Sequence, residues 1–231
     1  MKTLRHVLAF AFLLGPALHA TPITVGTANT GNCGPFMCSN DSGENPPVWV
    51  DYEEAYVSSA FPGPTTISSI SYAGFFHPNI VLGGNYAFSW GYSSNGLNLS
   101  SNLASNYSGS PNFLATFTIP AGGINFGSDL NFYGFTPFTY DPANGDLLLE
   151  IYVTNQDHVP NTGLNGYNAA DLNTTEITRA FNTSEGVNQG AGLGALVTTF
   201  NISSFVPEPS SLLLVGTGIA GCLSLIRKRR A

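Results

Sequence analysis

The sequence predicts an all-β protein, organised as an antiparallel, jelly-roll-like β-sandwich. Between residues 21 and 206 long helical periodicity is absent, and short β-like runs recur between clusters of Gly, Pro, Asn and Ser. Charged residues make up only 9% of the chain while hydrophobic residues make up 43%, a balance typical of an extracellular β-rich domain. About eight to ten strands over roughly 185 residues suit two packed sheets. An open β-solenoid is the alternative, but no regular repeat supports it.

The expected strands follow one another at short intervals. They are Trp49–Val57, Thr66–Gly74, Asn85–Tyr92, Leu114–Pro120, Leu130–Phe135, Leu147–Thr154 and Leu196–Ile202. In the fourth, Ala115, Phe117 and Ile119 should face inward, while Thr116 and Thr118 face outward.

The clearest strand signal follows the turn sequence of residues 141–146, DPANGD, because Pro presets a turn and Asn-Gly tolerates positive φ. After it, the inward set Leu147, Leu149, Ile151 and Val153 alternates with the outward set Leu148, Glu150, Tyr152 and Thr154. This period of two predicts a half-buried strand.

Charge is distributed very unevenly. Residues 21–206 contain one basic residue, Arg179, and thirteen acidic residues, which gives this body a formal charge of −12. Nucleic-acid binding is excluded as a function, because it depends on Lys and Arg that neutralise phosphates.

Residues 1–20 have the parts of a secretory signal peptide. Lys2 and Arg5 precede the apolar core of residues 7–14, and Ala20 offers a small residue at the cleavage point. We therefore expect an exported protein with a signal peptide at 1–20, a β-sandwich ectodomain at 21–205 and a C-terminal tail at 206–231.

The tail combines three features. Pro207, Glu208 and Pro209 precede a transmembrane helix expected at about 210–226, whose apolar stretch is residues 212–226, and a basic stop signal formed by Arg227, Lys228, Arg229 and Arg230. This stretch of fifteen residues would span roughly 22 Å as a helix, against the roughly 30 Å of a hydrocarbon core. The helix is thus a marginal span, with the basic cluster on the cytoplasmic side.

The order and spacing of these features resemble the PEP-CTERM sorting signal, which is also described as an ice-binding protein C-terminal domain. The resemblance implies recognition by exosortase, a membrane-embedded enzyme of Gram-negative bacteria, and a role among the cargo of systems that make exopolysaccharide or biofilm. It implies an inner-membrane-anchored precursor that reaches the cell surface or extracellular matrix. A permanently anchored single-pass surface protein is the alternative.

Cys33 and Cys38, in CGPFMC, are expected to form a disulfide in the oxidising space outside the cell. A metal or redox pair is the alternative. Cys222 lies in the apolar stretch of the tail and is expected to be an apolar filler.

Few residues in the body suggest chemistry. Asp51 and Glu53 would share one face of a strand, as glycosidase carboxylates can, while Glu150 stands by itself on another strand. The histidines His77 and His158 lie beside Pro, in expected loops. We therefore expect no catalytic site, and a secreted carbohydrate-active enzyme is the alternative.

Ligand binding is a further expectation. Asp157 and Asp171, in or beside the polar insertion of residues 154–175, could contribute to Ca²⁺ binding, although no EF-hand pattern is present. No other cofactor is expected. Trp49 and Trp90 are the aromatic residues to test for stacking on sugars. The predicted function is a surface or matrix protein with a structural or glycan-binding body.

Overall fold

The computed structural model describes residues 21–37, 49–76, 80–157, 167–183 and 189–205. One sheet contains β1 (Ile23–Val25), β2 (Thr30–Asn32), β4 (Thr65–Phe76), β9 (Asp129–Tyr140), β11 (Tyr167–Asp171), β14 (Ala195–Leu196) and β15 (Thr198–Phe205). The other contains β3 (Trp49–Tyr56), β6 (Gly84–Tyr92), β7 (Asn112–Ile119), β10 (Leu147–Thr154), β12 (Ile177–Thr183) and β13 (Gln189–Gly192). A separate pair is formed by β5 (Ile80–Val81) and β8 (Ile124–Asn125).

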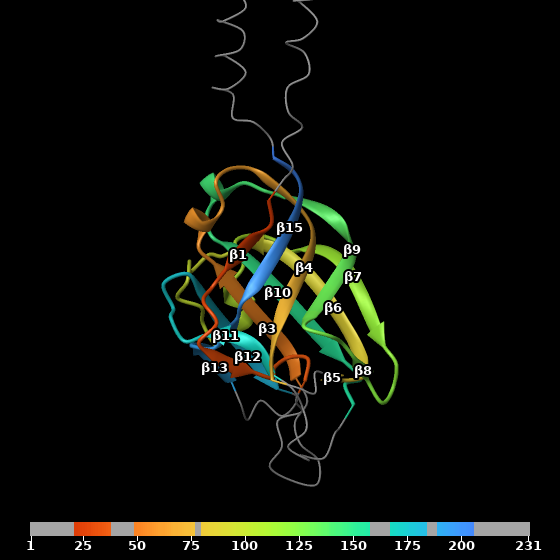
Figure 1. Ribbon diagram of the computed structural model, residues 1–231. Helices are drawn as coiled ribbons and strands as arrows, with labels where there is room; N and C mark the ends of the chain where they lie inside the picture. The colour runs from red at the N-terminus through yellow and green to blue at the C-terminus, as the bar shows by residue number, and fades with distance from the viewer. Residues whose placement is uncertain (1–20, 38–48, 77–79, 158–166, 184–188, 206–231) are drawn as a thin grey trace, which may run out of the picture.

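The strand pairs are antiparallel in both large sheets (Figure 1). The seven-stranded sheet has the order β1-β15-β4-β11-β14, with β2 beside β11 and β9 beside β4, and the six-stranded sheet has the order β13-β12-β3-β10-β6-β7. The predicted all-β antiparallel class is confirmed. The jelly-roll-like connectivity stays a prediction.

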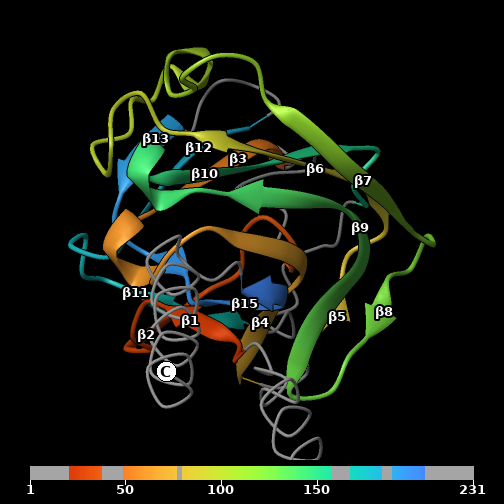
Figure 2. The ribbon, with the colours of Figure 1, turned by 90° about the horizontal axis from the view of Figure 1, so that it is seen from above.

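The two large sheets face each other as layers around an aromatic core (Figure 2). Phe200 of β15 packs across the interface against Tyr56 of β3 and Trp90 of β6, with ring centroids 4.8 Å and 5.8 Å apart. All three side chains are fully buried. Inter-sheet aromatic contacts of this kind hold the sandwich together.

The loop after β2 also enters the core. Phe36 is fully buried, and its ring centroid lies 5.3 Å from that of Tyr72 and 5.2 Å from that of Phe132. The Gln156 side chain donates a hydrogen bond to the Pro35 carbonyl over 2.6 Å. Cys33, at the start of this loop, takes part in a disulfide. Because Cys38 lies outside the described residues, the Cys33–Cys38 pairing stays a prediction.

One expected strand and one expected polar insertion need correction. The strand expected at Leu196–Ile202 is two strands, β14 and β15, because the Val197 amide donates to the Ala169 carbonyl of β11 and the chain then moves beside β4. The polar insertion expected at residues 154–175 contains β11, whose Ala169 and Ala170 are buried.

The strongest local predictions are confirmed. Along β10, Leu147, Leu149, Ile151 and Val153 are buried. Ala115, Phe117 and Ile119 of β7 pack against the core while the intervening threonines are exposed. The turn before β10 contains the 3-10 helix η3 (Pro142–Asn144), capped by a hydrogen bond from the Ala143 amide to the Asp141 carboxylate.

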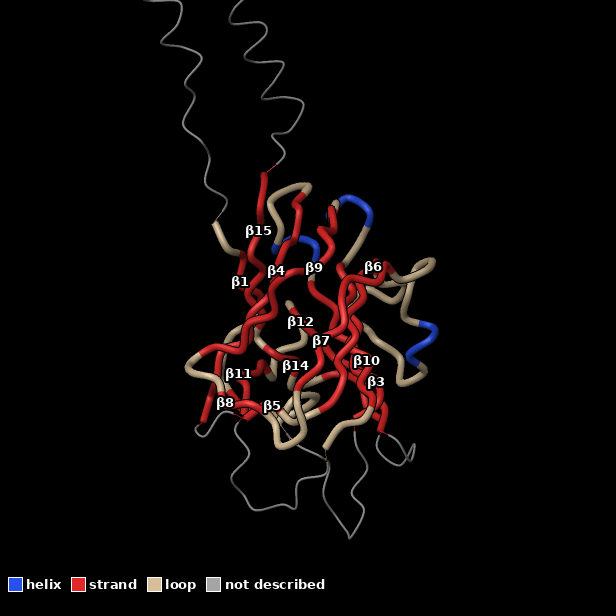
Figure 3. The backbone as a smooth tube through the Cα atoms, turned by 90° about the vertical axis from the view of Figure 1, so that its right-hand side faces the viewer, coloured by secondary structure: helices blue, strands red, loops and turns tan. Residues whose placement is uncertain are grey.

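Helices are few and short in the described part of the chain (Figure 3). They are the 3-10 helices η1 (Ser58–Ala60), η2 (Leu103–Ser105) and η3. Within that part, none is long and apolar enough to cross a membrane. The expected signal peptide at 1–20 and the expected membrane helix at about 210–226 lie outside the described residues.

Candidate functional site

Strand β3 presents carboxyl groups to both faces of the six-stranded sheet. Alternation along the strand places Glu54 between the sheets, together with Tyr52 and Tyr56. Asp51 and Glu53 lie on the opposite, outer face. The face shared by Asp51 and Glu53 therefore follows the prediction, while Glu54 has a separate role.

Glu54 forms a hydrogen-bonded bridge between the two sheets. The Tyr52 and Tyr56 hydroxyls donate to its carboxyl oxygens over 2.7 Å and 2.6 Å. From the opposite sheet, the Leu196 amide donates to Oε1. Burial raises the pKa of Glu54 to about 7, while these hydrogen bonds and the charge of Arg179 lower it. Its oxygens are occupied by protein donors, so Glu54 is a structural residue.

The outer face collects three carboxyl groups. In the register of β10 on β3, Glu150 lies opposite Glu53 and Tyr152 lies opposite Asp51, and directly opposed Cβ atoms are about 4.5–5.5 Å apart. Burial, with the nearby Glu150 charge, raises the pKa of Asp51 to about 7. Burial also raises the pKa of Glu53 to about 8, and the Asp51 and Glu150 charges add to this. Sheet pairing thus unites carboxyls that the sequence separates.

A loop between β6 and β7, residues 93–111, covers part of this face and is fastened by Asn106. The Asn106 side-chain nitrogen donates to Glu53 Oε2 over 2.6 Å and to the Ser100 carbonyl over 2.9 Å. Its oxygen accepts from the Ser100 amide and the Asn95 side chain. Because all four hydrogen-bonding positions of this buried amide are used, Asn106 fixes the loop over Glu53, which is only 1% exposed.

The same loop packs an apolar patch onto the sheet. Leu99 and Leu103 cover Ala55, Leu148 and Ala180 of three neighbouring strands. This explains why Leu148 is buried although the alternation along β10 points it away from the main core.

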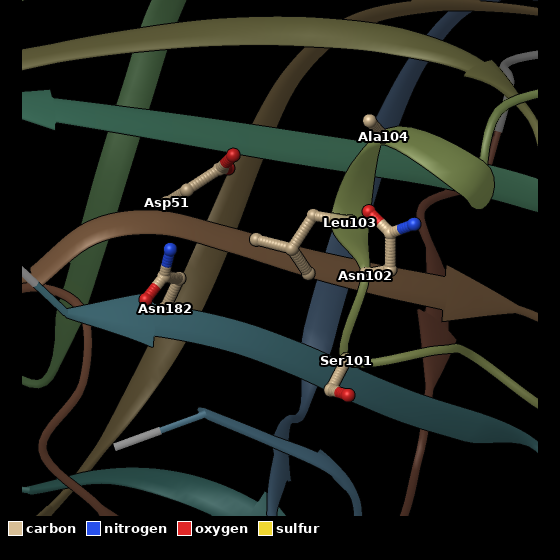
Figure 4. A pocket seen from close by; sticks show the side chains of 6 residues that line it. All are labelled: Asp51, Ser101, Asn102, Leu103, Ala104 and Asn182. Carbon is tan, nitrogen blue, oxygen red and sulfur yellow. The ribbon is translucent and has the colours of Figure 1, made fainter. Parts of the chain in front are cut away.

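A pocket of about 470 Å³ lies at the edge of the covering loop (Figure 4). It is lined by Asp51, Ser101, Asn102, Leu103, Ala104 and Asn182. Asp51 and Asn182 lie opposite each other on β3 and β12. The Oδ1 atom of each is buried and has no hydrogen-bond partner among the described residues. Since buried polar atoms are normally paired, these two acceptors are suited to a ligand that donates hydrogen bonds.

One of the two tryptophans singled out from the sequence, Trp90, lies inside the core rather than on an exposed surface. Trp90 is fully buried and packs against Phe138 and Phe200, so this candidate is not available for stacking on sugars. Trp49 begins β3, but its side chain lies outside the described residues, as do His77 and His158.

Asp157 and Asp171 serve separate loops. The Asp171 carboxylate accepts hydrogen bonds from the Thr27 amide, the Asn29 side chain and the Asn173 amide, at 2.7–2.8 Å. Asp157 accepts from the Gly122 amide over 2.7 Å. No group of three or more His, Cys, Asp or Glu residues could hold a metal ion within the described ranges. A contribution of these two residues to Ca²⁺ binding stays a prediction.

Sequence reasoning missed Asn106 and Asn182. Asn106 lies in a loop rich in Ser and Asn, where nothing in the local pattern distinguishes it, and Asn182 lies in β12, which was not expected as a strand. Tyr152 could have been found, because the alternation along the predicted strand already turned it outward.

We expect Glu53→Gln to flatten the pH dependence of stability. Burial raises the pKa of Glu53 from its ordinary value of 4.5 to about 8, so between these pH values the folded protein keeps a proton that the unfolded chain releases. Its stabilising contribution is therefore complete below about pH 4.5 and is lost as the pH rises to about 8, at up to about 1.4 kcal/mol per pH unit.

Urea unfolding at several pH values between 5 and 9 measures this effect. The variant should lose less stability across the series than the wild type, with the residual slope due to Asp51, Glu54 and Glu150, whose pKa values are also raised. Exposed Glu176, changed to Gln, is the matched control. Identical slopes for wild type and Glu53→Gln would contradict the burial of a protonated Glu53.

Beyond these sites, the C-terminal end of β15 leads directly into the tail. Residues 205–230 match a family model described as the PEP-CTERM protein-sorting motif. The tail is a PEP-CTERM sorting signal. Searches among curated proteins and among solved structures found no match.

The PEP-CTERM signal supports an exported protein that exosortase processes and that is sorted to the bacterial cell surface. The matched range includes Pro207, Glu208 and Pro209, and it ends with the basic residues Arg227 to Arg230. The structural expectations for these residues lie outside the described part of the chain.

Proposed function

We propose that this exosortase-sorted protein is a glycan-binding protein of the cell surface or matrix, and that its ligand occupies the pocket beside Asp51. The observation that carries the proposal is the pair of buried oxygens on Asp51 and Asn182 that have no hydrogen-bond partner within the described part of the chain. Both are acceptors, so the complementary groups are hydrogen-bond donors. Neighbouring sugar hydroxyls supply such donors in pairs.

The surroundings favour a sugar over other ligands rich in donors. Tyr152 lies beside Asp51 in the sheet and is 46% exposed, so its ring can stack on the apolar face of a pyranose. The formal charge of −12 on the body repels acidic polysaccharides. The favoured ligand is therefore a neutral glycan, and a neutral exopolysaccharide fits this description.

A glycan array followed by calorimetry on the purified protein tests the proposal. Asp51→Ala should weaken binding at least about tenfold, because hydrogen bonds to a charged group contribute about 1.5–3 kcal/mol. Binding should also weaken as the pH falls below about 7, where Asp51 becomes protonated. Tyr152→Ala should weaken binding as well.

Two exposed residues on the seven-stranded sheet provide matched controls. Asp129→Ala and Tyr133→Ala remove the same side-chain types away from the pocket and should bind as the wild type does. Failure of every neutral glycan to bind, or equal affinities for Asp51→Ala and Asp129→Ala, would reject the pocket as the binding site.

A carbohydrate-active enzyme is the second candidate function. It is favoured by the opposition of Glu53 and Glu150, since the two carboxyls of retaining glycosidases are about 5–5.5 Å apart. The burial of Glu53 beneath Asn106 counts against it. Reducing-end analysis of the bound glycans decides between the two: turnover that disappears in Glu150→Gln supports the enzyme, and intact glycans support binding.

A further inference from the structure

Strand β15 belongs to the folded body and to the sorting signal at once. Phe205 is its last paired residue, opposite Thr65 of β4, and is also the first residue of the matched sorting motif. Only Val206 separates it from Pro207. Because an extended residue spans at most about 3.6 Å, the Pro-Glu-Pro triplet begins within about 7 Å of the sheet. An enzyme that reads this triplet therefore meets the folded body.

The two halves of β15 are held very differently. Thr198 to Phe200 lie between β1 and β4, because β1 pairs with these three residues and its pairing ends at Phe200. Phe200 is fully buried in the aromatic core. This half is fixed on both sides.

The second half, residues 201–205, has β4 as its one strand neighbour within the described residues. The pairing is also irregular there, with register shifts between Asn201 and Ile202 and between Ile202 and Ser204. Such irregularities disrupt the ladder of backbone hydrogen bonds. Of the side chains described in this half, Ile202 is the one in the core, at 9% exposed.

We propose that residues 201–205 separate from β4 when exosortase engages the tail, while the rest of the sandwich remains folded. Five released residues lengthen the reach of the tail by roughly 17 Å. Pro207 and Pro209, which follow in the sequence, lack a backbone N–H group, so neither can donate a ladder hydrogen bond that would oppose release. A weakly paired segment of this kind is where local opening is expected.

A cross-strand disulfide tests the proposal in the full chain, in a host with its exosortase. In a Cys222→Ala background, Thr66→Cys and Ser204→Cys occupy directly paired positions on β4 and β15. Oxidation should slow conversion of the precursor at least about tenfold, and reduction should restore it. Conversion is followed by intact mass, as loss of Arg227 to Arg230, with an exosortase-deficient strain as the reference for unprocessed chain.

The matched control places the same crosslink in the fixed half. Ser71→Cys and Thr199→Cys are paired on the same two strands, and this variant should be processed at the wild-type rate. Adding a ten-residue Gly-Ser spacer after Phe205 should restore processing of the oxidised Thr66–Ser204 pair. Normal processing of that pair without a spacer, no rescue by the spacer, or no tail processing in the wild type would each overturn the proposal.

Amide hydrogen exchange gives a second measurement that needs no enzyme. The amides of residues 201–205 should exchange at least about tenfold faster than those of residues 198–200. Equal protection of both halves would also overturn the proposal.

Discussion

Glu54→Ala is expected to lower the free energy of unfolding by about 3–5 kcal/mol, as removal of one member of a buried charged network does. The Tyr52 and Tyr56 hydroxyls and the Leu196 amide would lose their common acceptor inside the sandwich. Each unsatisfied buried donor costs about 1–3 kcal/mol. Both sheets would lose hydrogen bonds to Glu54, because the two tyrosines belong to the same sheet as Glu54 and Leu196 belongs to the opposite sheet.

Urea unfolding followed by near-ultraviolet circular dichroism measures this loss. Glu54→Gln should be intermediate, because it retains one acceptor oxygen but places an NH₂ group among donors. Exposed Glu176→Ala should change stability by less than about 0.5 kcal/mol, as surface substitutions usually do. A loss for Glu54→Ala that is no larger than this control would contradict the role of Glu54 as an inter-sheet bridge.

The strands that could be predicted are those in which burial and hydrophobicity coincide. In β10 every second residue is apolar and buried, so period and burial agree. Strands β11 and β12 were missed because polar side chains occupy their buried positions, including Asn168, Asp171 and Thr178. Asp171 accepts a hydrogen bond from the Thr27 amide, and Thr178 donates one to the Leu97 carbonyl. Because these partners lie far away in the sequence, the local hydrophobicity pattern does not indicate that the two side chains are buried.

The candidate site likewise contains some residues whose proximity the sequence could predict and others whose proximity it could not. Asp51 and Glu53 lie two residues apart, so their common face follows from the strand period alone. Glu150 joins them only through the register of β10 on β3, which no local pattern fixes. Asn182 and the covering loop depend on a third strand and on Asn106, a single residue in a uniformly polar stretch.

The loop that contains Phe36 was predicted only in part from the sequence. CGPFMC was expected to contain a disulfide, and Cys33 at its start takes part in one. The burial of this loop in the core was not predictable, because Phe36 and Met37 are not part of an alternating pattern of apolar and polar residues that would indicate burial. The cavity that accepts Phe36 is built by Tyr72, Phe88 and Phe132, which come from three strands.

Phe36→Ala should therefore lower the free energy of unfolding by about 3–5 kcal/mol, the usual cost of truncating a buried Phe. Phe36 is fully buried, and its neighbours belong to the rigid strands β4, β6 and β9, which cannot close around the space it leaves. Thermal and urea unfolding under oxidising conditions would measure the change, so that the disulfide at Cys33 is retained in both proteins.

Phe113→Ala is the matched control, because Phe113 is 62% exposed on β7 and its loss should leave stability within about 0.5 kcal/mol of the wild type. Phe36→Leu should recover part of the loss by refilling the space with an apolar side chain. If Phe36→Ala were as stable as Phe113→Ala, the loop would be a surface segment, and the seven-stranded and six-stranded sheets would have to pack without it.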